Sequence, residues 1–204
     1  MRFLVLAFAC ALAACATPNG VVKTARHANH PTTGFTHCSA FGCGTMTVGM
    51  TFSQGEWDEI GALFAGTADA GDERARIAKA VSRFEQIAGP KDGTDKDRGG
   101  SGLFVIQSDP GQLDCYAEAG NTTVALLMMQ ASGFLKFHTV GDAAMRGLPY
   151  GTFGLEHATA TIVETATGRR WAVDSWFFDN GGPTFVVDYE VWRAGWDAPG
   201  GAKN

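Results

Sequence analysis

Three residues whose side chains can perform nucleophilic chemistry follow one another along the chain: Cys115, His157 and Asp174. A cysteine thiolate attacks carbonyl carbons, a histidine takes up the thiol proton and returns it, and a carboxylate fixes the tautomer of that histidine. Taken alone, Cys115 has a simpler interpretation as a buried and inert thiol, because free cysteine is among the most buried residue types. The choice depends on the elements that carry these residues.

Cys115 is predicted to lie in the first turn of a helix. Residues 115–130 favour a helix that Asp114 would cap at its start and Gly133 would end. The free N–H groups and the dipole at a helix start stabilise a thiolate, and the N–H of Cys115 is placed to hold a developing oxyanion. Glu118, one turn further on, would act against this, because a nearby carboxylate raises the pKa of a thiol.

His157 and Asp174 are predicted to lie on the two strands of one hairpin. Residues 157–164 are rich in small and β-branched side chains, the turn signal 165–168 follows, and a second strand-like segment returns from it. A register with both residues on one face lets Asp174 accept a hydrogen bond from the imidazole while the other ring nitrogen meets Cys115. A slip of one residue would put them on opposite faces.

The N-terminus predicts export. Arg2 precedes an apolar stretch, and Leu12-Ala13-Ala14-Cys15 resembles the lipobox of bacterial lipoprotein signal peptides. Residues 1–14 are expected to be the signal peptide and Cys15 the lipidated residue. The protein is then periplasmic, and Ala16 after Cys15 resembles outer-membrane sorting in Gram-negative lipoproteins. Ordinary secretion is the alternative, while a membrane-spanning helix would need roughly 20 apolar residues.

Export permits disulfides, which divides the remaining cysteines. Cys38 and Cys43 are five positions apart, and a bend at Gly42 would close them into a disulfide. Cys115 is then unpaired, and an odd cysteine in an exported protein is a reactive thiol or an intermolecular partner. A zinc site would compete with the disulfide, but the spacing of its potential ligands matches no common zinc motif: His27, His30, His37, Cys38 and Cys43. We therefore predict no metal and no cofactor.

Other segments predict a strand, two helices and loops. Residues 45–52 alternate as a half-buried strand with Met46, Val48, Met50 and Phe52 on one face. A capping box of Ser53 and Glu56 begins a helix that ends at Gly66, and residues 72–88 form a second helix stopped by Gly89-Pro90. Residues 91–100 mix both charges with glycine and are expected to be a solvated loop, whose aspartates lack the EF-hand spacing of a calcium site.

Composition limits the partners. The chain has 204 residues, 45% of them hydrophobic and 18% charged, which is typical of a globular domain. Its net charge is −5, and its lysines and arginines form no cluster. Nucleic acid is therefore not expected as a partner, because binding to phosphates needs clustered positive charge.

The motifs together resemble the transglutaminase-like superfamily, which shares papain's mechanism. They are similar in particular to bacterial transglutaminase-like cysteine peptidases, over residues 36 to 196 and in four segments: Asp114-Cys115 with Glu118-Ala119-Gly120-Asn121-Thr122-Thr123, His157-Ala158-Thr159-Ala160, Gly168-Arg169-Arg170-Trp171-Ala172-Val173-Asp174-Ser175-Trp176, and Asp179-Asn180-Gly181. The resemblance implies an α+β fold in which a nucleophile helix packs on an antiparallel sheet.

The resemblance also implies roles for individual residues. Cys115 would be the nucleophile, His157 the general base and then acid, and Asp174 the orienting residue. Papain-like enzymes carry a glutamine ahead of the nucleophile as an oxyanion donor, which makes Gln112 a candidate. A peptide or a glutamine side chain would be the substrate, through a thioester on Cys115. Because the superfamily includes members without activity, the alternatives are a catalytically silent binding module of the envelope and a structural lipoprotein with Cys115 in its core.

The expected organisation along the chain has four parts. The signal peptide of residues 1–14 is followed by a flexible tether over 15–34, since that stretch is polar and lacks hydrophobic periodicity. A single transglutaminase-like domain spans 35–196, and residues 197–204 form a disordered tail.

Overall fold

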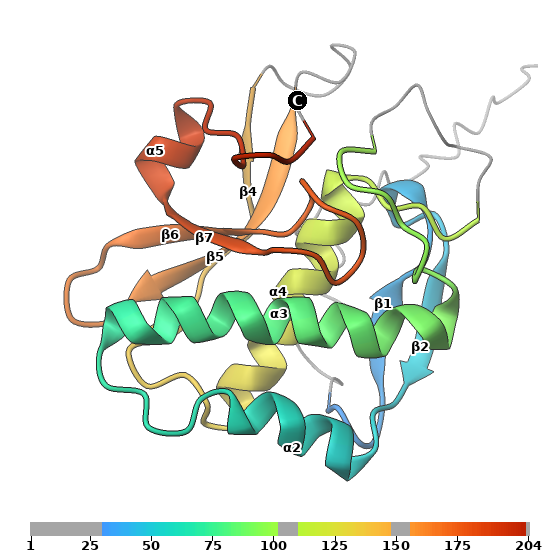
Figure 1. Ribbon diagram of the computed structural model, residues 1–204, viewed down its shortest axis with the longest axis horizontal. Helices are drawn as coiled ribbons and strands as arrows, with labels where there is room; N and C mark the ends of the chain where they lie inside the picture. The colour runs from blue at the N-terminus through green and yellow to red at the C-terminus, as the bar shows by residue number, and fades with distance from the viewer. Residues whose placement is uncertain (1–29, 102–109, 148–155, 203–204) are drawn as a thin grey trace, which may run out of the picture.

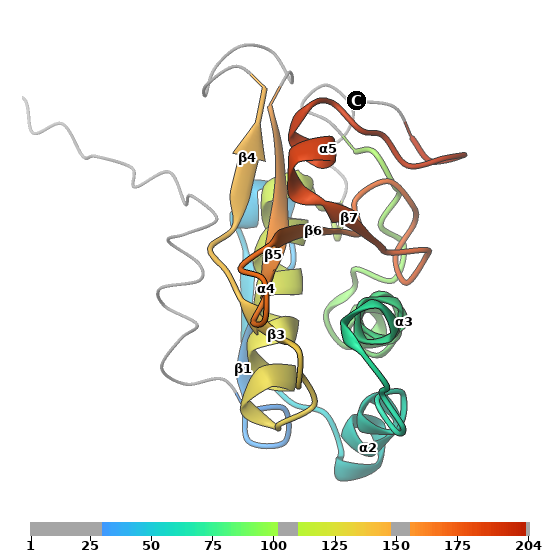
Figure 2. The same ribbon diagram turned by 90° about the vertical axis from the view of Figure 1, so that its left-hand side faces the viewer.

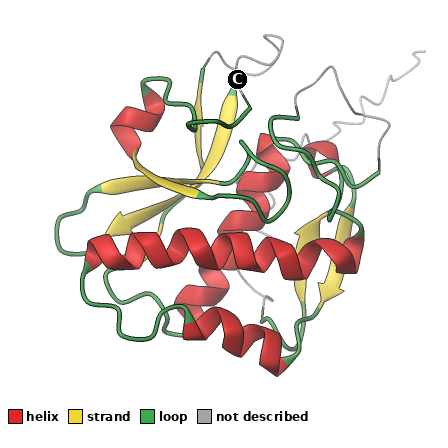
Figure 3. Ribbon diagram, in the orientation of Figure 1, coloured by secondary structure: helices red, strands yellow, loops and turns green. Residues whose placement is uncertain are grey.

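The computed structural model describes residues 30–101, 110–147 and 156–202. It confirms the α+β class, with helices and antiparallel strands in one body (Figures 1 and 3). The predicted signal peptide, Cys15 and the tether up to residue 29 lie outside the described residues. Within the described ranges, no helix has the length and apolar character needed to cross a bilayer.

The elements follow one another in a mixed order. They are β1 (Phe35–Cys38), a 3-10 turn (Phe41–Cys43), β2 (Met46–Met50), α2 (Gln54–Ala62), α3 (Ala70–Asp92), α4 (Cys115–Ala131), β3 (His138–Val140), β4 (Ala144–Arg146), β5 (His157–Glu164), β6 (Arg170–Asp174), β7 (Phe185–Asp188) and α5 (Tyr189–Arg193).

The larger sheet is antiparallel and has the order β3-β5-β6-β7, and β4 also pairs with β5. Both β3 and β4 pair with β5: β3 with its last residues and β4 with its first, from His157 to Thr159. Helix α4 contacts β5 and also β1 of the separate β1-β2 pair, and α3 crosses α4 (Figures 1 and 2). The helix that carries Cys115 is therefore enclosed by strands and helices from three parts of the chain.

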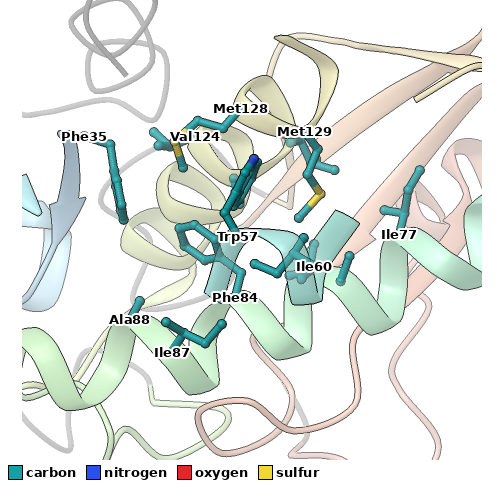
Figure 4. Close-up of a cluster of buried hydrophobic side chains, with 14 of the residues drawn as sticks. Phe35, Trp57, Ile60, Ile77, Phe84, Ile87, Ala88, Val124, Met128 and Met129 are labelled. Carbon is teal, nitrogen blue, oxygen red and sulfur yellow. The ribbon is translucent and has the colours of Figure 1, made fainter. Parts of the chain in front are cut away.

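The main core lies where α2, α3 and α4 meet the two sheets, and Figure 4 shows its centre. Ile60, Ile77 and Leu126 have no exposed surface. The Phe84 ring lies 5.0 Å from that of Phe52 and 5.5 Å from that of Phe35, which ties α3 to the β1-β2 pair. Burying each such side chain contributes about 1.5–3 kcal/mol, so this cluster fixes the position of α4.

Two of the predicted helix starts are confirmed, whereas the helix predicted over residues 72–88 begins earlier, at Ala70. Ser53 and Glu56 form the capping box of α2, and the Asp114 carboxylate accepts from the Ala117 N–H at 2.9 Å at the start of α4. The predicted end of α3 at Gly89-Pro90 is wrong, because the helix continues through Pro90 to Asp92 and ends at Gly93, whose φ is +86°. Burial of Asp92 against His37 holds this last turn in place, a tertiary contact that the local signal does not contain.

Two expectations about exposure are corrected. Met46 and Val48 in β2 are exposed, and only Met50 and Phe52 of the predicted apolar face are buried. The last residues of the predicted tether are packed, since Pro31 is buried and its carbonyl accepts from the Phe52 N–H at 2.7 Å. The N-terminal boundary of the domain therefore lies at or before residue 30.

The predicted disordered tail is also packed over residues 197–202. Ala198 is 5% exposed and belongs to the same buried cluster as Cys115. The Ala202 N–H donates to the Phe177 carbonyl at 2.9 Å. Composition alone suggests disorder here because the segment is rich in glycine, but it packs against aromatic side chains that only the folded structure supplies.

A disulfide joins Cys38 and Cys43, as predicted. It closes the turn beside α4, where the Asn121 side chain bonds both the N–H and the carbonyl of Cys38. We expect reduction of this bond to lower the free energy of unfolding by about 2 kcal/mol, because the loop it closes is short. Urea unfolding with and without dithiothreitol measures the loss. A Cys38→Ala, Cys43→Ala double variant that is insensitive to dithiothreitol is the control, and equal stability of the oxidised and reduced wild type would contradict the expectation.

Candidate active site

The β5-β6 hairpin puts His157 and Asp174 on one face of the sheet. Ala160 pairs with Val173 and Thr161 with Ala172. Continuing this register places Asp174 opposite Thr159, two residues after His157 and therefore on the same face. The slip of one residue that would have separated the two side chains does not occur.

The two side chains form a buried hydrogen bond. His157 Nε2 lies 2.7 Å from Asp174 Oδ2, and neither residue is more than 2% exposed. The same oxygen accepts from the Trp192 indole N–H at 2.7 Å. Because Oδ2 accepts from the indole, which can only donate, we assign the imidazole hydrogen to Nε2. The other nitrogen, Nδ1, then carries a lone pair.

His157 Nδ1 is buried and has no hydrogen-bond partner among the described residues. A buried polar atom without a partner costs about 1–3 kcal/mol, so such atoms in a folded protein call for an explanation. A nitrogen that takes up a proton during a reaction is one explanation, since its lone pair must be free beforehand.

Cys115 lies beside the main chain at the start of β5. It is the first residue of α4, and the Ala158 N–H donates to its sulfur. Nδ1 is the imidazole nitrogen nearer the main chain, so with Nε2 directed at Asp174 it remains on the backbone side of the ring. The start of α4 and the start of β5 lie at the same end of the molecule (Figure 1). The structure thus brings all three predicted residues to one place, although no hydrogen bond joins the Cys115 sulfur to Nδ1 within the described chain.

The electrostatics of Cys115 differ from the expectation. Burial raises the pKa of its thiol well above the ordinary value, the Asp114 carboxylate adds to this, and Asp174 and Glu156 act in the same sense. The Ala158 N–H acts in the opposite sense and is outweighed. The helix start therefore does not by itself ionise the thiol, and chemistry at Cys115 requires a base in its surroundings.

An aromatic shell excludes water from the imidazole. The His157 ring lies 4.7 Å from the Trp176 ring and 5.3 Å from the Phe177 ring, measured between centroids. Trp176 and Phe177 also belong to the buried cluster of Cys115. These residues directly follow β6, so the same strand that supplies Asp174 supplies the cover of His157.

Glu118 does not face the thiol as the sequence suggested. Its carboxylate accepts from the Ser175 hydroxyl at 2.9 Å, and it is buried beside two further carboxyl groups, Glu85 and Asp97. Burial and the charge of Glu118 raise the pKa of Asp97 to about 9, and a hydrogen bond to Glu118 acts in the same sense. The loop 91–100, expected to be solvated, thus places a buried acid behind α4.

The Gln112 side chain forms hydrogen bonds with the main chain of the loop 91–100. Its Nε2 donates to the Lys96 carbonyl at 2.8 Å and its Oε1 accepts from the Arg98 N–H at 3.2 Å. The side-chain amide of the predicted oxyanion donor is therefore engaged away from the thiol. The main-chain N–H of Cys115 remains a candidate oxyanion donor, because the first N–H groups of a helix have no acceptor within it.

Sequence reasoning missed two residues that contact this site. The bond between Trp192 and Asp174 joins residues that are 18 positions apart in the chain. Arg146 lies on β4, a strand without a clear sequence signal, and is paired with His157. Asp188, which caps the start of α5, is a local signal that could have indicated an ordered element near Trp192.

The zinc interpretation finds no support in the described part of the chain, where no group of three or more histidine, cysteine or acidic side chains is arranged to hold a metal ion. His27 lies outside the described residues. His37 pairs with Asp92 at 2.7 Å instead, and the two cysteines are joined as a disulfide.

Comparisons with known proteins add no assignment to this geometry. The chain matches no protein-family model, no curated protein and no solved structure.

Proposed function

We propose that this protein is a thiol-dependent hydrolase or acyl transferase of the transglutaminase-like type, acting on peptide or glutamine side-chain amides. The observation that carries the proposal is the His157–Asp174 bond, which leaves Nδ1 buried and without a partner among the described residues, next in the chain to Ala158, whose N–H donates to the Cys115 sulfur. The nucleophile helix on an antiparallel sheet is the arrangement that the sequence resemblance implies.

Catalysis would proceed by acyl transfer to the sulfur. Nδ1 takes the proton of Cys115 as the sulfur attacks the amide carbon, and the Cys115 N–H holds the oxyanion. The Nδ1 proton then passes to the leaving amine, the C–N bond breaks, and a thioester remains on Cys115. Nδ1 then takes a proton from the water or amine that attacks the thioester and passes it to the departing sulfur, so the C–S bond breaks and the thiol is restored as the acid or the new amide leaves. Asp174 holds the ring and stabilises its transient positive charge.

A hollow beside this site suits an extended peptide. It has a volume of about 450 Å³ and is lined by Gly99 and residues 177–183 and 200–202. Phe177 connects the two places, because it lines the hollow and its ring packs on His157. Five of the lining residues are glycines, whose main-chain groups are not covered by a side chain and can bond to the backbone of a peptide: Gly99, Gly181, Gly182, Gly200 and Gly201.

We expect incubation with a peptide mixture to produce new termini, or amine incorporation at glutamine, in wild type only. Cys115→Ala removes the nucleophile, so it should reduce the rate to the uncatalysed level, and His157→Ala should lower it at least about a hundredfold. Mass spectrometry of the products, with and without a labelled amine, measures the rates and separates hydrolysis from transfer. Products formed equally by the Cys115→Ala variant would overturn the proposal.

A binding module without activity is the second candidate. The burial of Cys115 favours it, because only 8% of this residue is exposed and its thiol holds its proton strongly. This candidate predicts that peptides bind without turnover and that Cys115→Ala leaves the affinity unchanged. Isothermal titration with the same peptides tests it.

We also propose that the protein is exported and anchored by lipid on Cys15, facing the periplasm. The lipobox and the disulfide between Cys38 and Cys43 support this, because disulfides persist in oxidising compartments. Metabolic labelling with a palmitate analogue, lost in Cys15→Ala, tests the anchor.

A further inference from the structure

The His157–Asp174 pair has neighbours on both sides in the sheet. Arg146 of β4 is paired with His157, and Asp174 of β6 lies diagonally across from it. Paired residues share a face of the sheet, so Arg146 is on the face that carries the imidazole. Its side chain is only 6% exposed, which is unusual for an arginine and indicates a specific arrangement of partners.

Arg146 binds the segment around α5 at three points. Its Nη1 donates to the Trp192 carbonyl at 2.6 Å and to the Trp196 carbonyl at 2.5 Å, and its Nη2 lies 3.2 Å from Asp197 Oδ1. The guanidinium also lies 5.0 Å from the centre of the Trp192 ring. One side chain therefore fixes both the backbone and the ring of Trp192.

Helix α5 needs such an anchor. It has five residues, and isolated helices this short are unstable in water. The Asp188 side chain caps the first turn of α5. At the other end of the helix, Arg146 donates to the Trp192 carbonyl, which lies in the last turn. Without Arg146, Trp192 would lose the hydrogen bond to its carbonyl and the guanidinium beside its ring, which together hold the indole in position near Asp174.

Trp192 in turn fixes the Asp174 carboxylate by a hydrogen bond. Its N–H donates to the oxygen of Asp174 that faces His157 Nε2, and its ring lies 5.7 Å from the imidazole ring. Two donors on one oxygen fix the direction of the carboxylate, which selects the tautomer with hydrogen on Nε2 and a lone pair on Nδ1. The residue is fully buried, so water cannot replace its N–H.

We propose that Trp192 and Arg146 are positioning residues for the reaction: Trp192 orients Asp174 and His157 through its indole N–H, and Arg146 acts through Trp192. This inference rests on the proposed function for its catalytic consequence. The hydrogen-bond arrangement itself can be tested without any activity.

The decisive variant is Trp192→Phe, which keeps an aromatic ring and removes the N–H. Trp171→Phe is the matched control, because the Trp171 indole N–H is also buried but has no acceptor among the described residues. The readout is the NMR signal of the His157 Nε2 proton, assigned by its loss in His157→Ala; a bond to a buried carboxylate shifts it downfield and slows its exchange with water. Trp192→Phe should increase that exchange rate about tenfold, and Trp171→Phe should leave it unchanged.

Activity gives a second readout. Trp192→Phe should lower kcat about tenfold with little change in KM, and Arg146→Met should lower it similarly, with Arg146→Lys restoring part of the loss. An Nε2 proton unaffected by Trp192→Phe would overturn the positioning role. If Trp192→Phe changes the Nε2 proton signal but wild type shows no turnover, the positioning role stands and the proposed function is rejected.

Discussion

Asp174→Ala is expected to lower the rate of thioester formation on Cys115 by at least about a hundredfold. The substitution removes the acceptor of both the His157 and the Trp192 bonds, so the ring loses the contact that fixes its tautomer. Because burial keeps the Cys115 thiol protonated, the reaction depends on a correctly oriented base more than it would with a thiol that ionises by itself.

Asp174→Asn separates orientation from charge. An asparagine oxygen in the place of Oδ2 can accept both bonds, so the ring keeps its direction but loses the negative charge that stabilises imidazolium. We expect a rate between those of wild type and Asp174→Ala. Trapping of the acyl-enzyme and intact-mass analysis measure it, with the exposed Asp58→Ala as the control. Equal rates for Asp174→Ala and wild type would contradict the orienting role.

The buried carboxyl groups should make the protein less stable as the pH rises. Burial raises the pKa of Glu85, Asp97 and Glu118, and Asp97 reaches about 9. Between the ordinary carboxyl pKa of about 4 and these raised values, the folded state binds more protons than the unfolded state. The free energy of unfolding therefore decreases through this window, and the contribution of these groups is fully present only below about pH 4.

Glu118→Gln should weaken this dependence. Glutamine can still accept a hydrogen bond from the Ser175 hydroxyl. Because it carries no charge, it no longer repels the surrounding carboxyl groups or attracts His37. The titratable neighbours come from α3, the loop after α3, β6 and β1: Glu85, Asp97, Asp174 and His37. We expect the variant to be more stable than wild type by about 1 kcal/mol at pH 8 and to have a flatter pH profile. Urea unfolding from pH 5 to 9 measures both quantities.

Glu190→Gln is the control for this comparison, because Glu190 is exposed on α5. A wild type whose stability is constant or increases between pH 5 and 9 would contradict the assignment of protons to the buried cluster. A Glu118→Gln variant with the wild-type slope would place the responsible groups elsewhere.

Local signals predicted the parts of the site that depend on neighbours in sequence. The cap at Asp114 and the turn at 165–168 are made by adjacent residues, so the start of α4 and the β5-β6 hairpin followed from the sequence. The hairpin also carried the choice of His157 and Asp174, but the sequence left its register open, and the register that puts both on one face comes from the structure.

Contacts between segments far apart in the chain could not be predicted from the sequence. The residues next to Asp97 in the sequence are typical of a solvated loop. Asp97 is nevertheless only 4% exposed, because α3 and α4 close over it. The thiol of Cys115 shows the same limit: the helix start predicted a lowered pKa, whereas burial by β5 and the aromatic shell raises it. The depth of a side chain is set by the whole fold, so its pKa cannot be inferred from one element.

The central claim, that His157 is the base for Cys115, is tested most directly by the alkylation rate of Cys115 with iodoacetamide from pH 5 to 10, followed by peptide mass mapping in wild type and His157→Ala. We predict that wild type reacts at least about tenfold faster than His157→Ala at pH 7, because Nδ1 accepts the thiol proton as the sulfur attacks. In both proteins the rate should rise with pH, because burial keeps the thiol protonated. The same rate in both proteins at every pH would contradict the account.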